Sequence, residues 1–179
     1  MLEGFGLIMR IMGSICLVGG MALGGILTAD RFRGRLEEMS GISRIFLMLR
    51  GEVEYHGLVL PEAIRSVGER MEGSLQELLM EIAGKMEDGS GQTFGVIWRS
   101  ELNDYFAYSN LNKEDKKLLL SMGNHLGYLD KRMQTASIDL FLEEWKTEME
   151  DSRKRLPGQC RIASCLGIVS GLLLAVIMI

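Results

Sequence analysis

Two segments at opposite ends of the chain carry no charged residue. Residues 11–29 are uncharged over nineteen positions and residues 162–179 over eighteen, although the chain contains 20 basic and 24 acidic side chains. A helix needs about 20 apolar residues to cross a ~30 Å hydrocarbon core. The sequence therefore predicts a membrane-spanning helix at each end. It excludes a freely soluble single domain, a disordered chain and, at a net charge of −4, a nucleic-acid binder that depends on overall basicity.

Each segment has one alternative interpretation. The first could be a cleaved signal peptide with Ala22-Leu23-Gly24 as its cleavage site. Against this, only Arg10 precedes the apolar run, and three arginines that resist translocation follow it, Arg31, Arg33 and Arg35. The second could be a buried core helix, but it has no polar face. We therefore expect two retained spans.

Basic residues adjoin the inner end of each predicted span. They are Arg31, Arg33 and Arg35 after the first span, and Arg153, Lys154, Arg155 and Arg161 before the second. Lys and Arg close to a span stay on the cytoplasmic side. The expected organisation is an N-terminal segment and transmembrane helix over residues 1–29, a cytoplasmic helical bundle over 30–158, and a C-terminal transmembrane helix over 159–179.

The middle of the chain is strongly acidic. Residues 36–152 contain 12 basic and 22 acidic side chains, a net charge of −10. The basic residues on either side can meet anionic lipid head groups. An acidic body between two such basic collars is expected to favour basic protein partners.

The spacing of apolar residues predicts an all-α fold. The chain has only two prolines, and no stretch alternates strictly enough to be a strand. After Leu36, apolar residues recur in steps of three and four at Met39, Ile42, Ile45, Phe46, Leu49 and Val53. We expect about six cytoplasmic helices in an antiparallel bundle with short connections.

Capping and breaking residues predict where these helices begin and end. The expected boundaries are a break at His56-Gly57, a first-turn proline at Pro61, a capping box at Ser74 and Glu77, N-caps at Asn112 and Asp130, a corner from Gly123 to Gly127, and the end of the last long helix at Pro157-Gly158.

Small residues recur every fourth position in both predicted spans. The two ridges are Cys16, Gly20, Gly24 and Thr28 in the first span, and Ala163, Gly167, Gly171 and Ala175 in the second. Each ridge contains a Gly-x-x-x-Gly step, which lets helix backbones approach closely. We expect the spans to pack together or against partner spans.

The sequence offers little that resembles a catalytic or metal site. His56 and His125 each stand next to a glycine in a predicted turn, and the cysteines form no zinc-binding pattern. The segment 88–93 lacks the lysine of a phosphate loop and follows a helix. We expect no enzymatic activity, no cofactor and no metal.

Several short patterns occur in an order that resembles the stage III sporulation protein AB family. After the first span come Leu49-Arg50-x-Glu52-Val53-x-Tyr55 and Leu60-Pro61-Glu62-Ala63. They are followed by Trp98, by Met122-Gly123-x-x-Leu126-Gly127-x-x-Asp130-x-x-x-Gln134, and by the second span. The resemblance covers essentially the whole chain.

The resemblance implies a subunit of the channel complex between mother cell and forespore. It places the chain in the mother-cell-derived outer forespore membrane as a multi-pass protein, with most of its residues in the mother-cell cytoplasm. The family's helical domain is similar to the cytoplasmic module of the platform proteins of type II secretion and type IV pili. The implied partners are a secretion-type ATPase and other stage III channel subunits, without nucleic acid; self-association into a homo-oligomer stays open.

The residues of these patterns are expected mainly to define helix ends and corners. They are Glu52, Tyr55, Pro61, Gly123, Gly127, Asp130 and Gln134. The glycines suit sharp or close backbone geometry, Asp130 suits a cap, and Tyr55 suits an interhelical hydrogen bond. Two alternatives remain: a platform protein of a general secretion or pilus system, and a membrane-anchored enzyme or adaptor. The enzyme would need a buried, convergent polar cluster.

Overall fold

A computed structural model describes the backbone of residues 30, 32–89, 91–127 and 130–178, and side chains as far as Lys154. The predicted span 11–29, with Gly20 and Gly24, lies outside the described residues, and so do the side chains of Ala163, Gly167, Gly171 and Ala175. Within the described part of the chain, no helix is long and apolar enough to cross a membrane. Both spans therefore stay predictions.

The described residues form helices and no strands, which confirms the predicted all-α fold. A first helix over residues 32–51 runs directly into a π-helical turn, η1 (Glu52–His56). The chain then continues through α2 (Leu60–Gly68), α3 (Ser74–Glu87), α4 (Phe94–Tyr105), α5 (Lys113–Ser121), α6 (Gly123–Leu126) and α7 (Lys131–Met178).

The chain divides into two compact units. One is Gly34–Asp151, which we call the helical body, and the other combines Met1–Arg33 with Ser152–Ile179. The helical body has its own core and contains every residue of the family patterns. The description below concerns this unit.

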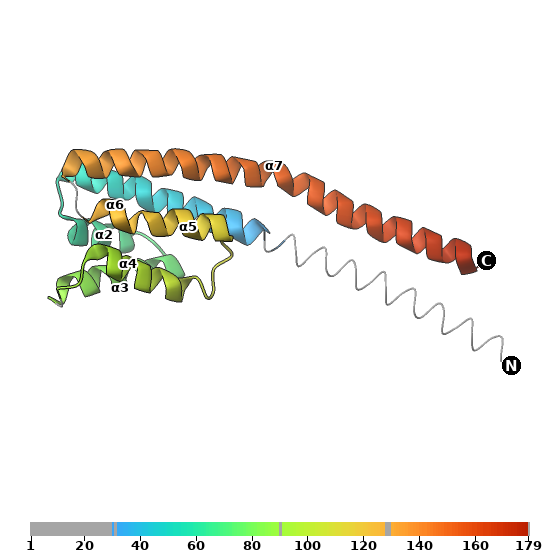
Figure 1. Cartoon of the computed structure of the whole chain (residues 1–179), viewed down its shortest axis with the longest axis horizontal. Coiled ribbons are helices and arrows are strands. Elements are labelled where there is room, and N and C mark those ends of the chain that lie inside the picture. The colour runs from blue at the N-terminus through green and yellow to red at the C-terminus, as the bar shows by residue number, and fades with distance from the viewer. Residues whose placement is uncertain (1–29, 31, 90, 128–129, 179) are drawn as a thin grey trace. The chain divides into compact units, whose positions relative to one another are not determined.

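The first helix and the body's part of α7 run antiparallel. The indole nitrogen of Trp145 donates a hydrogen bond to the carbonyl oxygen of Met39 (2.9 Å). Further along, the rings of Phe46 and Phe141 lie 4.3 Å apart. Because residue numbers rise along one helix and fall along the other, the two helices point in opposite directions, side by side in Figure 1.

The apolar stripe of the first helix forms the centre of the core. All six predicted stripe residues are buried, which confirms the helical spacing. Helix α4 adds four buried apolar residues, Phe94, Ile97, Trp98 and Leu102. Helices α3 and α4 lie on the side of the body away from α7 (Figure 1). The core therefore lies between the long antiparallel pair and the shorter helices.

Two of the expected N-caps are confirmed and one is wrong. Asn112 Oδ1 accepts the backbone N–H of Asp115 (2.8 Å), whose carboxylate in turn accepts the N–H of Asn112 (2.9 Å). Asp130 Oδ1 accepts the N–H of Met133 (2.9 Å). The capping box at Ser74 does not form, because α3 already begins there and Gly73, at φ 66°, is the N-cap. Glycine reaches this positive φ without steric cost.

The predicted end of the last helix at Pro157-Gly158 is also wrong. The backbone of α7 is helical from Lys131 to Met178. A proline removes one N–H donor and crowds the preceding turn, but a helix that continues on both sides can absorb this cost.

Candidate functional site

The residues of the family patterns lie at one end of the helical body. This is the end where the first helix finishes and α7 begins, with η1, α2 and α6 beside them (Figure 1). The structure places them in two groups. One is centred on Glu52 in η1, and the other on the connection through α6.

Glu52 is a buried carboxylate with two partners. It is 5% exposed, accepts a hydrogen bond from the guanidinium of Arg70, and lies 2.8 Å from Nδ1 of His56. Its backbone oxygen also accepts the N–H groups of Gly57 and Leu58, which closes the π-helical turn. Gly57 ends the turn at φ 65°, and the helix breaks here, as predicted for His56-Gly57. Glu52 thus joins the first helix to the end of α2.

The other two residues of this group are Pro61 and Tyr55, and only the first is placed as the sequence predicted. Pro61 stands in the first turn of α2, as predicted. Tyr55 is 77% exposed, and within the described residues its hydroxyl has no hydrogen-bond partner, so the expected interhelical hydrogen bond is wrong. The π turn directs Glu52 and Val53 inwards and leaves Tyr55 facing solvent.

The two glycines of the α6 connection allow close helix packing. A Cβ atom on Gly123 would lie 2.6 Å from Cδ1 of Trp98, and one on Gly127 would lie 3.0 Å from Cβ of Phe94. Neither glycine has a positive φ. Both therefore serve close approach to the aromatic face of α4 and not a sharp turn.

Gln134 ties the end of α6 to the beginning of α7. Its Nε2 donates a hydrogen bond to the carbonyl oxygen of Leu126 (2.9 Å). This carbonyl is the last of α6, and the final carbonyls of a helix have no donor within the helix. With the Asp130 cap, Gln134 links the end of α6 to the first turn of α7.

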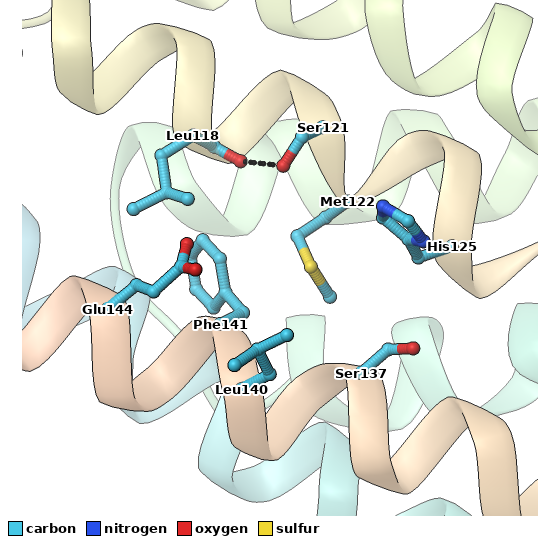
Figure 2. A pocket seen from close by; sticks show the side chains of 8 residues that line it. All are labelled: Leu118, Ser121, Met122, His125, Ser137, Leu140, Phe141 and Glu144. Carbon is cyan, nitrogen blue, oxygen red and sulfur yellow. Dashed lines mark hydrogen bonds between the residues drawn. The ribbon is translucent and has the colours of Figure 1, made fainter.

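A shallow pocket lies beside this connection, between α5–α6 and α7 (Figure 2). Its volume is about 140 Å³, and Met122 and Phe141 supply buried apolar surface. The hydroxyl of Ser121 is already used in a hydrogen bond to the carbonyl of Leu118 (2.6 Å). The remaining lining residues are His125, Ser137, Leu140 and Glu144. Within the described residues, no cluster of His, Cys, Asp or Glu could hold a metal ion.

An ion-pair network that the sequence did not indicate lies at the opposite end of the body. Arg35, 9% exposed, donates from Nε to Asp115 Oδ2 (2.6 Å) and from Nη2 to Asp115 Oδ1 (2.8 Å). Its Nη2 also reaches Glu148 on α7 (3.3 Å). The hydrogen bonds to Asp115 raise the pKa of Arg35, although burial opposes this. Arg35 was expected to belong to a basic collar, but it joins the first helix, α5 and α7.

Two further acidic residues are internal hydrogen-bond acceptors. Glu101 on α4 is 2% exposed and accepts from Lys85 Nζ on α3 (2.6 Å). A hydrogen bond to Glu101 raises the pKa of the Glu81 carboxyl. Glu38 accepts from the hydroxyl of Tyr105 (2.6 Å), and the pKa of Tyr105 is raised, first by burial and then by this bond. Helical spacing places Glu101 on the buried face of α4, four residues after Ile97 and three after Trp98, but it does not indicate which partner on another helix each of these charges meets.

The buried carboxylates of the body therefore form separate ion pairs, each of which links two parts of the fold. Glu52, Glu101 and Asp115 lie on different elements, and each has a cationic partner from another helix or turn. They do not converge on the pocket of Figure 2. Such an arrangement fixes helices to one another and leaves the outer surface as the part that can act on other molecules.

The packing at Gly123 gives a direct test of the α6 connection. The Gly123→Ala variant is expected to lose about 1–3 kcal/mol of unfolding free energy, because the new methyl group overpacks a buried tryptophan. Denaturant unfolding measures the change. Gly84→Ala is the control: nothing lies within 4 Å of its Cβ position on α3, so it is expected to stabilise by about 0.4–1 kcal/mol. Equal effects of both substitutions would contradict the packing argument.

Comparison with known proteins identifies the same family that the order of the sequence patterns indicated. The family description "Stage III sporulation protein AB" matches residues 10–179. The curated Stage III sporulation protein AB of Bacillus subtilis (strain 168) is 19% identical over 170 residues, 95% of this chain and 99% of that protein. A solved structure of a Stage III sporulation protein AB is similar with a TM-score of 0.62 and 19% identity, over 69% of this chain and 96% of that one. Neither relative is named as an enzyme. Because the family match extends over nearly the whole sequence, this chain belongs to the stage III sporulation protein AB family and has a role in sporulation.

Proposed function

We propose that the protein is a non-enzymatic platform subunit of the channel complex between mother cell and forespore. Residues 11–29 and 162–179 anchor it in the mother-cell-derived outer forespore membrane, and the helical body lies in the mother-cell cytoplasm. There it holds or couples a secretion-type ATPase, as the cytoplasmic modules of secretion platform proteins do. Family membership and the two uncharged segments with their basic flanks support this proposal.

The observation that best supports binding of an ATPase is the acidic surface of the α2–α3 hairpin. Residues 60–88 contain seven acidic and three basic side chains. Each of the three cations is paired: Arg65 with Glu87, Arg70 with Glu52, and Lys85 with Glu101. All seven carboxylates are exposed, namely Glu62, Glu69, Glu72, Glu77, Glu81, Glu87 and Asp88. Such a surface would steer and orient a basic partner surface.

Binding of the full-length chain in detergent to a purified secretion-type ATPase of the channel complex tests the proposal. We expect binding that weakens as salt is raised, because exposed charges are screened. A variant carrying Glu69→Lys, Glu72→Lys and Glu77→Lys around the α2–α3 connection is expected to bind at least about tenfold more weakly.

The matched control carries the same change of charge on another surface. Glu143, Glu144 and Glu150 are exposed on α7, and their replacement by lysine is expected to leave binding nearly unchanged. If both variants lost binding equally, the α2–α3 surface would not be the docking site. Absence of binding at low salt would reject the coupling role itself.

A further inference from the structure

The loop between α4 and α5 carries the most exposed of the body's large apolar side chains. Tyr108 is 92% exposed, and its neighbour Ala107 is exposed as well. Residues 106–112 contain no charged side chain, although the body as a whole is dense in charges. A tyrosine facing outwards from an uncharged loop combines an apolar ring with a polar hydroxyl, which suits a boundary between apolar and aqueous surroundings.

The loop is held firmly on both sides of Tyr108. Before it, Lys116 Nζ lies 5.1 Å above the ring of Phe106 and donates to the carbonyl oxygen of Phe106 (3.0 Å). After it, the N–H of Asn110 donates to Glu38 Oε2 (2.7 Å), and Leu111 is buried in the core. The exposure of Tyr108 is therefore imposed by ordered neighbours.

These neighbours place the loop where the chain enters and leaves the body. A Cβ atom on Gly34, the first residue of the body, would lie 3.0 Å from Nδ2 of Asn110. Just after the loop, Asp115 holds Arg35, which also contacts Glu148, three residues before the body ends. The predicted first span ends at residue 29. Five residues reach at most about 18 Å, so this end of the body stays close to the span by connectivity alone.

The charge of this segment differs from that of the body. Residues 34–151 contain 13 basic and 22 acidic side chains, a net of −9, whereas residues 105–117 contain three lysines and two acids. One of these acids, Asp115, is buried against Arg35. The exposed acids nearest in sequence are Asp104 and Glu114, and Glu37 lies on the first helix. The loop and the start of α5 are thus less acidic than the body as a whole, which favours contact with anionic head groups.

From these observations we propose that the α4–α5 loop is a membrane-contacting loop, with the ring of Tyr108 in the head-group region of the bilayer. Tyrosine favours this region because its ring is apolar and its hydroxyl stays hydrated. Lys113 and Lys117, both exposed on α5, meet anionic lipid phosphates. The inference rests on the membrane anchoring proposed above and adds a contact between the body itself and the bilayer.

Depth-dependent fluorescence quenching tests the contact. The full chain is reconstituted into anionic vesicles with and without brominated lipid, as the Tyr108→Trp variant and as the Tyr55→Trp variant. Tyr55 is the matched control, an exposed tyrosine in η1 at the other end of the body. The native Trp98 and Trp145 are buried and give the same background in both. We expect quenching of the new tryptophan to be at least about twofold stronger at position 108 than at 55.

Four other results would overturn the contact. Equal quenching at the two positions would show no preference for this end. A blue-shifted emission at position 108 without quenching would indicate a protein surface over Tyr108 in place of lipid. A chain that does not enter the vesicles would reject the proposed anchoring together with this inference. A reconstituted chain that binds the ATPase without quenching at position 108 would reject the loop contact alone.

Discussion

Replacing Asp115 with alanine is expected to lower the unfolding free energy of the chain by about 3–5 kcal/mol. The substitution leaves Arg35, 9% exposed, without the carboxylate that binds it through two hydrogen bonds. It also removes the acceptor for the N–H of Asn112 at the start of α5. Denaturant unfolding of the full chain in detergent, followed by the fluorescence of the two core tryptophans, measures the loss.

The Arg65–Glu87 pair is the control for this prediction. Both side chains are about two-fifths exposed, and Arg65→Ala is expected to cost less than about 1 kcal/mol, as exposed pairs do. Replacing Arg35 and Asp115 together by methionine and leucine should cost less than the two single losses added, because neither charge is then buried alone. If Asp115→Ala fell within 1 kcal/mol of the Arg65 control, the network would not matter for stability.

The Trp145→Ala substitution is expected to lower the unfolding free energy by a similar amount, about 3–5 kcal/mol, but through a different mechanism. Trp145 has no exposed surface, stacks on Phe141 at 5.3 Å between ring centres, and donates to the carbonyl of Met39 on the first helix. Removing the indole leaves a cavity between the two antiparallel helices. Circular dichroism during thermal unfolding measures the effect, because one of the fluorescent reporters is lost.

Two further variants separate the cavity from the loss of an aromatic ring as such. Trp145→Phe keeps an aromatic ring in the core, so it is expected to lower the unfolding free energy by less than Trp145→Ala does. Tyr108→Ala removes a ring of similar size from a 92% exposed position and is expected to change stability by no more than about 0.5 kcal/mol. A Trp145→Ala variant as stable as Tyr108→Ala would contradict the packing between the first helix and α7.

Features that depend on local spacing could be predicted from the sequence. The six stripe residues from Met39 to Val53 are buried because one face of a helix must face the core whatever lies opposite. Asn112 and Asp130 cap their helices, since such caps need only the neighbouring backbone. The all-α fold and the family followed from the same kind of information.

Features that depend on the partner across the core could not be predicted. Arg35 looks like one more arginine beside a membrane span, and only the fold brings Asp115, eighty residues away, next to it. Tyr55 faces solvent because η1 adopts a π turn, which α-helical spacing does not indicate. Ser74 fails as a cap because Gly73 already takes that position. In each case tertiary contacts or a special backbone conformation decided the outcome.

The placement of the Arg35 network has a mechanical consequence. The first helix and α7 are antiparallel, and the chain enters at Gly34 and leaves at Asp151, so a force that separates these two points peels the helices apart from that end. A force that peels the helices apart strains the contacts between them one after another. A shearing force along the helix axes would strain all of these contacts at the same time. The first contacts loaded are those of Arg35 with Asp115 and Glu148. A buried charge pair with two hydrogen bonds therefore lies at the point where an unzipping force would begin, and it protects the aromatic packing further along.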